Sequence, residues 1–266
     1  MLRECMVFVV AVLAGSGSAR GAAAEQPNVL LVVTDDQGYW DTGWSGNEQI
    51  DTPTMDKLAE EGAAFTRFYV EPVCAPTRAG LMTGRHYLRT GIYNTRFGSD
   101  TLGKDEITLA ELLKQAGYRT GLFGKWHLGK YAGYRPHDRG FDEFLGHYHG
   151  HIERYEYADQ LVHNGRPVHT RGYVTDLFTD AAIEFIETSG RRPFFCYLAY
   201  NAPHSPFVLD TSHDQQPTGD ALIEKYLQRG LPLREARIYG MVEGTSIGCS
   251  NGWRSLTWPK IRSSYS

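Results

Sequence analysis

The chain has 266 residues, of which 41% are hydrophobic and 22% are charged, and its formal net charge is -4. This balance is typical of an ordinary globular protein with one large core. The slightly acidic charge provides no general basic field, which argues against nucleic acid as a partner. An anionic ligand would need a local cluster of cations.

The first 24 residues have the features of a secretory signal peptide. Arg3 is followed by an apolar run over residues 6–14, and small residues end the segment at Ala24, before Glu25. The run is too short to span a bilayer, and no second long apolar segment follows. We expect a secreted or periplasmic protein that begins near Glu25 and has no membrane span once the signal is removed. The alternative is an uncleaved membrane anchor.

An unbroken aliphatic run over residues 28–33 predicts a strand that is buried on both faces of a parallel sheet. Asp35 and Asp36 follow it directly. Open α/β sheets place ligands at the carboxyl ends of their strands, and hard cations such as Ca²⁺ or Mg²⁺ prefer carboxylate oxygens. Acidic residues also make turns, and the pair taken alone slightly favours a plain turn.

A helix is expected over residues 52–62, opened by a threonine cap and a proline, and a strand over residues 64–70 leads from it to Cys74. Cys74 stands at the start of a short helix that ends at Gly84. The positive end of that helix favours an anion, and Arg78 adds a planar donor fork that suits the oxygens of sulfate or phosphate.

Two of the four cysteines concern the mature core. Cys5 leaves with the signal and Cys249 lies in an atypical tail, which leaves Cys74 and Cys196. In an oxidising compartment a disulfide between these two is the simplest expectation. The sequence context favours free thiols instead, because Cys196 lies within an apolar run whereas Cys74 lies in a polar, electropositive turn.

A helix over residues 108–116 with a capping box precedes a strand that runs into a glycine-spaced segment ending at residue 129. If this segment is extended, Lys125 and His127 lie on the same side and Trp126 on the other. A lysine and a histidine that converge on one point suit an anionic ester. The same pattern is also common at a solvated strand end.

The remaining chain contains a loop, a helix and a strand. Residues 131–157 show no period and are expected to form a long loop, whose histidines receive no site role. A helix is expected over residues 174–189 and a strand over residues 194–200. His204 follows between two prolines, which would aim its ring, although a turn histidine with a local hydrogen bond is the plain alternative.

The alternation of strands and helices predicts an α/β fold with a mainly parallel sheet sandwiched between helices. Each candidate residue follows a predicted strand. Because the carboxyl ends of parallel strands share one edge of a sheet, these residues are expected to gather there.

Four separate motifs now make the chain resemble the sulfatase family of the alkaline phosphatase superfamily. They are the cysteine signature over residues 72–84, the second signature over residues 117–127, the acidic segment 34–38 and the Ala202-Pro203-His204 triplet. The resemblance covers about residues 27–243. It implies an alkaline phosphatase-like fold that is incomplete at the C-terminus, with a signal peptide over 1–24, the N-terminal part of a sulfatase domain over 25–243 and an atypical tail over 244–266.

The resemblance implies a sulfuric ester hydrolase that acts on a sulfated small molecule or carbohydrate. It implies that a formylglycine-generating or other sulfatase-maturing enzyme oxidises Cys74 to formylglycine, whose hydrate attacks the ester sulfur. It also implies that Ca²⁺, with Mg²⁺ as the alternative, is bound by Asp35, Asp36 and the modified Cys74.

The resemblance assigns roles to four further residues. Arg78 steadies the formylglycine, Lys125 and His204 hold sulfate oxygens or protonate the leaving group, and His127 assists proton removal from the hydrate.

The chain also departs from the family pattern. It contains no Asp-Asn or Asp-His dipeptide to complete the metal site, and Gly150 stands near the place of a family serine. Residues 244–266 contain no Asp or Glu. Two alternatives therefore stand beside the sulfatase reading: a catalytically incomplete sulfatase fragment, and a phosphate or phosphonate ester hydrolase of the same superfamily.

Overall fold

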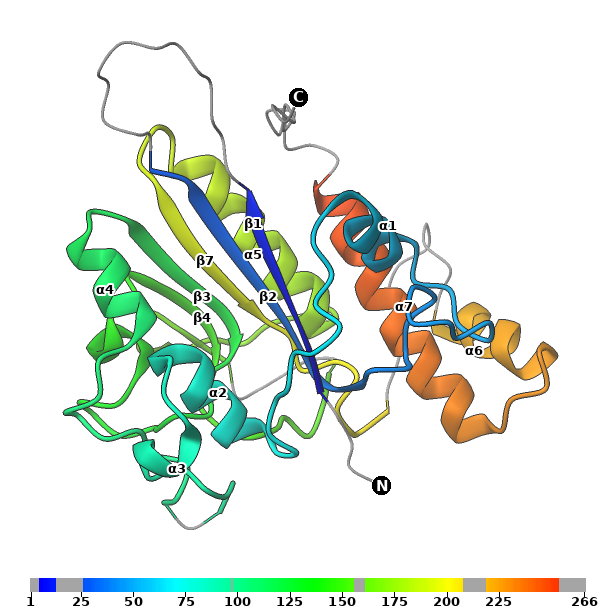
Figure 1. Cartoon of the computed structure of the whole chain (residues 1–266), viewed down its shortest axis with the longest axis horizontal. Coiled ribbons are helices and arrows are strands. Elements are labelled where there is room, and N and C mark those ends of the chain that lie inside the picture. The colour runs from blue at the N-terminus through cyan, green and yellow to red at the C-terminus, as the bar shows by residue number, and fades with distance from the viewer. Residues whose placement is uncertain (1–4, 13–25, 97, 156–160, 208–218, 254–266) are drawn as a thin grey trace.

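The computed structural model describes residues 5–12, 26–96, 98–155, 161–207 and 219–253, and for residues 5–12, 219–220 and 245–253 the backbone alone. The described residues form a seven-stranded sheet in the order β1-β2-β7-β3-β4-β5-β6 (Figure 1). The four neighbouring strands at its centre are parallel: β2 (Asn28–Gly38), β7 (Phe194–Ala199), β3 (Arg119–Lys125) and β4 (Glu143–His147). The strands outside them pair antiparallel: β1 (Cys5–Val12), β5 (Val162–His163) and β6 (Arg166–Pro167). The prediction of a mainly parallel sheet is confirmed.

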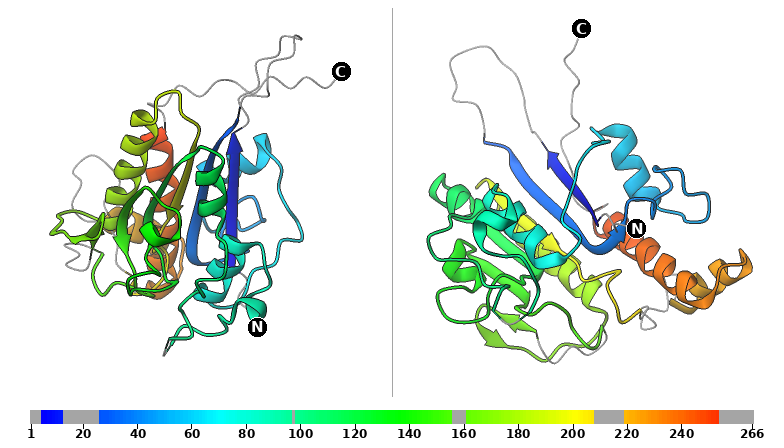
Figure 2. Two further views of the ribbon diagram at one scale, coloured as in Figure 1. Left: turned by 90° about the vertical axis from the view of Figure 1, so that its left-hand side faces the viewer. Right: turned by 60° about the horizontal axis from the view of Figure 1, so that its bottom comes forward.

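Helices cover both faces of this sheet (Figures 1 and 2). One face packs on α2 (Cys74–Thr83) and α4 (Leu109–Gln115), and the other packs on α5 (Val174–Thr188) and on Met241 of α7 (Leu233–Trp253). The side chains of β7 alternate between the two cores: those of residues 194, 196 and 198 join the α5 side, and those of residues 195, 197 and 199 join the α2 side. Both faces of β7 are therefore buried, as its unbroken apolar run predicts.

The start of β3 is tied to its neighbours by Arg119. Its guanidinium donates to the carbonyl of Phe185 and to Thr188 and forms an ion pair with Glu143 at 2.7 Å. It also lies over the ring of Phe185, 4.3 Å from the centroid. The amino-terminal end of the strand is thus held to α5 and β4.

The remaining helices lie beside the sandwich. They are α1 (Pro53–Glu61), α3 (Tyr87–Thr90), η1 (Pro136–Arg139) and α6 (Gly219–Gln228). The pair α6 and α7 forms a small core around Tyr226 and Val242 with Ile50. Ion pairs connect this small core to the segment before α1, because Lys225 of α6 contacts both Asp51 and the buried Glu243 of α7.

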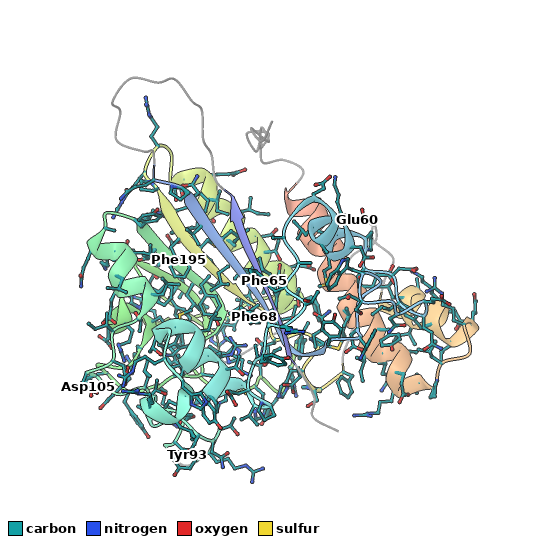
Figure 3. All side chains as sticks on the ribbon, viewed as in Figure 1. Glu60, Phe65, Phe68, Tyr93, Asp105 and Phe195 are labelled. Atoms are coloured by element: carbon teal, nitrogen blue, oxygen red, sulfur yellow. The ribbon has the colours of Figure 1, made fainter. Side chains whose placement is uncertain are left out.

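The strand expected over residues 64–70 does not form. These residues run as an irregular segment, on which Figure 3 labels Phe65 and Phe68. Phe65 and Tyr69 are 70% and 75% exposed. β1 occupies the outer edge of β2, and residues 64–70 pair with no strand of the sheet, including β1 at its edge. Aromatic and β-branched composition raises strand propensity but cannot supply a pairing partner.

The long loop expected over residues 131–157 is also wrong in part, because it contains η1 and the strand β4. β4 pairs in parallel with β3 over residues 143–147. Its five residues include a glycine, a glutamate and a histidine, so no apolar alternation marks it. Its strand conformation depends on the neighbouring β3.

The two predicted domain boundaries are not resolved by the fold. Residues 5–12, within the predicted signal peptide, pair with β2, and removal of this leader stays a prediction. Helix α7 continues past residue 244 to Trp253, so no backbone break marks the predicted start of the tail, and residues 254–266 lie outside the described part. Within the described residues, we find no helix that combines the length and the apolar character needed to cross a bilayer.

Candidate active site

The carboxyl ends of the four parallel strands and the amino end of α2 meet at one edge of the sheet (Figure 1). β2 brings Asp35 to this edge, β3 brings Lys125, and β4 brings His147. His204 follows β7, and Cys74 is the first residue of α2. Strand ends are where open α/β sheets bind ligands, so this edge is the candidate site.

The lowest layer of the site, which we call the floor, consists of Asp35, Arg78, Lys125 and His147, each at most 2% exposed. Lys125 Nζ pairs with one carboxylate oxygen of Asp35, and Arg78 lies 3.6 Å from the other. Burial alone would raise the pKa of Asp35, but Lys125 and Arg78 outweigh it and hold the pKa below its usual range. The floor therefore contains two cations and one carboxylate, a net positive charge beneath the α2 terminus.

Backbone and side-chain contacts fix the Arg78 guanidinium. It donates to the carbonyl of Lys125 and to the hydroxyl of Tyr197, both at 3.0 Å. Its Nε has no protein partner in the described residues. The ring of His147 is held in a similar way, since its Nε2 lies 2.8 Å from Asn201 Oδ1, and burial lowers its pKa to about 3.

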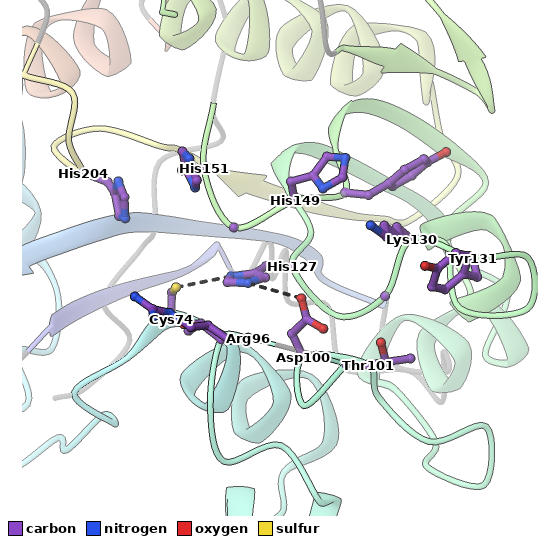
Figure 4. A pocket seen from close by; sticks show the side chains of 15 residues that line it. Cys74, Arg96, Asp100, Thr101, His127, Lys130, Tyr131, His149, His151 and His204 are labelled. Atoms are coloured by element: carbon purple, nitrogen blue, oxygen red, sulfur yellow. Dashed lines mark hydrogen bonds and ion pairs between the residues drawn. The ribbon is translucent and has the colours of Figure 1, made fainter. Parts of the chain in front are cut away.

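Cys74 and His127 form a close pair above the floor. The Sγ of Cys74 lies 3.2 Å from His127 Nδ1 (Figure 4). Burial, followed by the charges of Lys125 and Arg78, lowers the pKa of His127 to about 2, so its ring is neutral. A neutral imidazole beside this position can accept a proton from whatever group residue 74 carries.

His127 departs from the extended geometry that the sequence predicts. Its φ of 56° lies in the left-handed region, and Gly124 at the end of β3 has a φ of 118°. A side chain at Gly124 would collide with the Ala199 carbonyl of β7, so the bend requires glycine there. Lys125 thereby points into the floor, His127 toward Cys74, and Trp126 into the core against Phe141.

Asp36 and His204 form the opposite wall. Asp36 Oδ2 lies 3.6 Å from His204 Nε2, and the Asp36 backbone is also left-handed at a φ of 64°. Burial and the adjacent Asp35 charge raise the pKa of Asp36. His204 in turn stacks on the ring of His151 with 6.3 Å between the centroids. The acidic pair thus splits: Asp35 faces the buried cations and Asp36 faces this wall.

A cavity of about 670 Å³ opens above Cys74 and His127 (Figure 4). This volume is within the range of small-molecule sites and far exceeds one sulfate group. His204 also lines it, whereas Asp35, Arg78 and Lys125 lie below it. The structure therefore brings the predicted residues together, but in two layers.

A further set of cavity-lining side chains, which we call the rim, was missed from the sequence. It consists of Arg96, Lys130, Tyr131, His149 and His151, all exposed. Asp100 lines the cavity as well. The only available signal was the concentration of His, Tyr and Gly in residues 131–157, which loops share with many packing segments.

The disulfide alternative is wrong. Cys74 and Cys196 are both free, and Cys196 is fully buried in the core on the α5 side, where burial raises its pKa. This buried thiol is inert in comparison with Cys74, which lines the cavity.

The described residues do not by themselves fit a calcium ion, which takes six to eight oxygen ligands. Within them, no group of three or more His, Cys, Asp or Glu residues is arranged to hold a metal. Both oxygens of Asp35 already face cations, and only Asp36 offers a second carboxylate beside it.

Comparisons with known proteins show which family and which relatives the chain resembles. The family model described as Sulfatase matches residues 27–235. The N-acetylgalactosamine-6-sulfatase of Mus musculus is 36% identical over 226 residues, which cover 73% of this chain and 43% of that protein. Arylsulfatase J of Mus musculus is 36% identical over 202 residues, which cover 70% of this chain and 34% of that protein.

Among solved structures, Ps i-CgsB in complex with k-i-k-neocarrahexaose matches with a TM-score of 0.75 and 32% identity. The match covers 85% of this chain and 54% of the other. The chain spans less than half the length of the two curated relatives.

Proposed function

This chain belongs to the sulfatase family, and on that premise we propose that its cavity hydrolyses a sulfate ester through a formylglycine made from Cys74. The observation that carries the proposal is the position of Cys74: the first residue of α2, 3.2 Å from a neutral histidine and at the bottom of a cavity. The amino end of a helix and the cations below it favour an anionic group at this point.

The formylglycine would supply a hydrated aldehyde whose hydroxyl is the nucleophile. His127 Nδ1 faces the side chain at position 74, so it would accept the hydroxyl proton there. His204 lines the same cavity from the other wall and would donate a proton to the departing alcohol. The two imidazoles would thus divide base and acid duties.

Arg78 and Lys125 would act from below. Neither lines the cavity, and both are engaged by Asp35, so their contribution to a bound sulfate is the field of the net positive floor. Direct contact of Lys125 with sulfate oxygens would require its ammonium to leave Asp35. The predicted contact therefore stays a prediction.

Calcium is part of this proposal only as an added ligand. Asp35 and Asp36 are the predicted carboxylate ligands, but Asp35 would have to leave Lys125 or Arg78 to reach the ion, and the described residues alone do not complete its site. When bound, the ion would supply positive charge to the substrate oxygens. We also propose that a maturing enzyme converts Cys74 and that the chain is exported.

The proposed substrate class is a sulfated carbohydrate. The structurally similar Ps i-CgsB carries an oligosaccharide in its complex, and a cavity of about 670 Å³ has room for more than the sulfate group. Exposed Tyr131 offers a ring on which a sugar could stack.

Two measurements test the proposal. Peptide mass spectrometry over residues 73–85, after expression in a host that matures other sulfatases, should find formylglycine at position 74. The matured chain should turn over an aryl sulfate faster than the matched aryl phosphate. Unmodified cysteine alone would refute formylglycine catalysis, and a strong phosphate preference would favour the phosphate ester alternative.

A catalytically incomplete sulfatase fragment is the alternative, and one observation favours it. Among the described residues, no group of three or more His, Cys, Asp or Glu is arranged to hold a metal. Thermal unfolding during a calcium titration separates the readings, because a ligand that binds the folded state raises the melting temperature. No shift up to millimolar calcium, together with absent turnover, would support the fragment.

A further inference from the structure

His127 lies between two groups that face its two ring nitrogens (Figure 4). The Sγ of Cys74 is 3.2 Å from Nδ1, and Oδ2 of Asp100 is 3.7 Å from Nε2. Asp100 lies in the segment between α3 and α4, and its side chain is 32% exposed. The three residues therefore form a row from the nucleophile position to a carboxylate.

The ring of His127 has little freedom to leave this row. It is 2% exposed, and a Cβ placed on Gly150 would lie 2.6 Å from its Cε1 and 2.7 Å from its Nε2. The backbone of Gly150 thus packs directly against the ring edge. The orientation that directs Nε2 toward Asp100 is fixed by packing.

A neutral imidazole has one N–H, and its two neighbours decide which nitrogen carries it. The buried ring of His127 has Cys74 Sγ at Nδ1 and Asp100 Oδ2 at Nε2, and Lys125, Arg78, Asp35 and His147 lie around it. An ionised carboxylate only accepts hydrogen bonds, so Asp100 favours the proton on Nε2. Nδ1 is then left with its lone pair toward position 74.

The distance of 3.7 Å exceeds a hydrogen bond, so Asp100 acts in this arrangement through its charge. Asp100 is half-buried in a turn, and contacts of this kind often tighten only when a ligand is bound. The same logic, in which a carboxylate fixes the histidine tautomer, operates in nucleophile–histidine–carboxylate triads.

We propose that Asp100 is a positioning residue that holds the proton of His127 on Nε2 and so keeps Nδ1 open as the acceptor beside residue 74. The tautomer preference stands on the geometry alone, whereas its catalytic consequence rests on the proposed function. Asp100 touches neither Cys74 nor the floor in the described contacts; it acts through His127.

The test is the tautomer itself, read by long-range proton–nitrogen NMR of the full chain labelled with ¹⁵N at histidine. The His127→Gln variant identifies the signal. The wild-type ring should carry its proton on Nε2, and Asp100→Asn, whose amide can also donate, should move a measurable share to Nδ1. Asp100→Glu should restore the wild-type pattern.

Asp105→Asn is the matched control, because it removes the same charge from an exposed residue of the same segment without a contact to His127. Its spectrum should equal the wild-type spectrum. A wild-type proton on Nδ1, a doubly protonated ring, or an unchanged tautomer in Asp100→Asn would each overturn the proposal. Asp100→Ser gives a second comparison if Asp100→Asn does not fold.

The outcomes separate this inference from the proposed function. An Nε2 tautomer that depends on Asp100, in a chain without sulfate ester turnover, would support the positioning role and contradict the function. In a matured, active chain, Asp100→Asn should lower kcat about tenfold and leave KM within about twofold, because proton transfer and not binding is affected. Sulfate ester turnover in a chain whose His127 tautomer does not depend on Asp100 would support the proposed function and contradict the positioning role.

Discussion

The floor and the rim of the cavity differ in burial and in contacts, although both belong to the site around Cys74. The floor residues are at most 2% exposed and are held by mutual ion pairs and hydrogen bonds. The rim residues are exposed, and the contact between Lys130 and the Tyr131 ring, at 5.5 Å, is typical of a solvated pair. The side-chain positions of the floor are therefore fixed by buried contacts, whereas those of the rim are exposed to solvent.

This difference assigns different duties to the two halves. Buried charges cannot change partners without a large desolvation cost, so the floor presents the same field to every ligand. Exposed side chains rearrange at little cost, so the rim can adapt to the part of the substrate beyond the sulfate group. Four substitutions can break or sharpen this contrast.

The largest effect is expected for Lys125→Met. It leaves Asp35 buried with only Arg78 at 3.6 Å, and breaking a buried pair typically costs about 3–5 kcal/mol. Urea unfolding measures the loss. The control is Lys57→Met, which breaks an exposed pair and should cost under about 0.5 kcal/mol. Equal losses in the two variants would remove the distinction between floor and surface.

The next effect concerns pH. The folded pKa of His147 is about 3, below its ordinary 6.5, so the unfolded state binds more protons between these values. The free energy of unfolding should therefore fall as pH drops from about 6.5, by about 1.4 kcal/mol per unit for this residue.

His147→Gln should flatten that slope by about one proton, since glutamine keeps a polar contact with Asn201 but does not titrate. Unfolding by urea at pH values between about 6.5 and 4.5 gives the slope. Lys130→Gln, a charge change in the rim, should leave it unchanged. A wild-type slope in His147→Gln would show that the floor histidine is not buried neutral.

A smaller effect is expected at the boundary between floor and rim. In Gly150→Ala the new methyl group would meet the His127 ring at 2.6 Å, and overpacking of this kind costs about 1–3 kcal/mol. Gly244→Ala is the control, because its nearest neighbour is Leu222 at 3.8 Å, an ordinary contact. Thermal unfolding compares the two; a neutral Gly150→Ala would mean that the His127 ring can move.

The smallest effect on stability is expected for the rim variant Lys130→Ala, within about 0.5 kcal/mol of wild type. The same variant should weaken the thermal stabilisation that added sulfate produces, because an exposed cation at the cavity contributes to anion binding. Measuring the melting temperature with and without sulfate checks both statements. A loss of stability without sulfate would show that Lys130, like the floor residues, contributes to folding.

The sequence predicted the floor better than the rim for a physical reason. Strand β7 and the start of β2 are recognisable as apolar runs, and parallel strand ends share an edge, so Asp35 and Lys125 were expected together. His147 of the floor received no site role, because β4 has no apolar pattern. Which of them would be buried could not be foreseen. The pairing of Lys125 with Asp35 joins residues 90 positions apart and depends on the strand order.

The rim was not predicted, and the strand over residues 64–70 was predicted wrongly, for a related reason. Arg96, Lys130 and His149 lie on loops without a hydrophobic period, and only the folded chain brings them to one cavity. Residues 64–70 have the composition of a strand, yet they pair with no strand of the described sheet. In both cases the outcome depends on a partner that local sequence does not specify.

In strand β3, residues that affect only folding and residues that also affect the site lie at opposite ends of one short strand. The side chain of Arg119, at its first position, contacts α5, Ser189 and β4 and not the site, whereas Lys125 at its last position belongs to the floor. Substitutions at the two ends are therefore paired reporters. A screen that scores abundance and ligand response in parallel should see Arg119 variants in the first readout alone and Lys125 variants in both, so seven consecutive residues calibrate the separation of folding from chemistry.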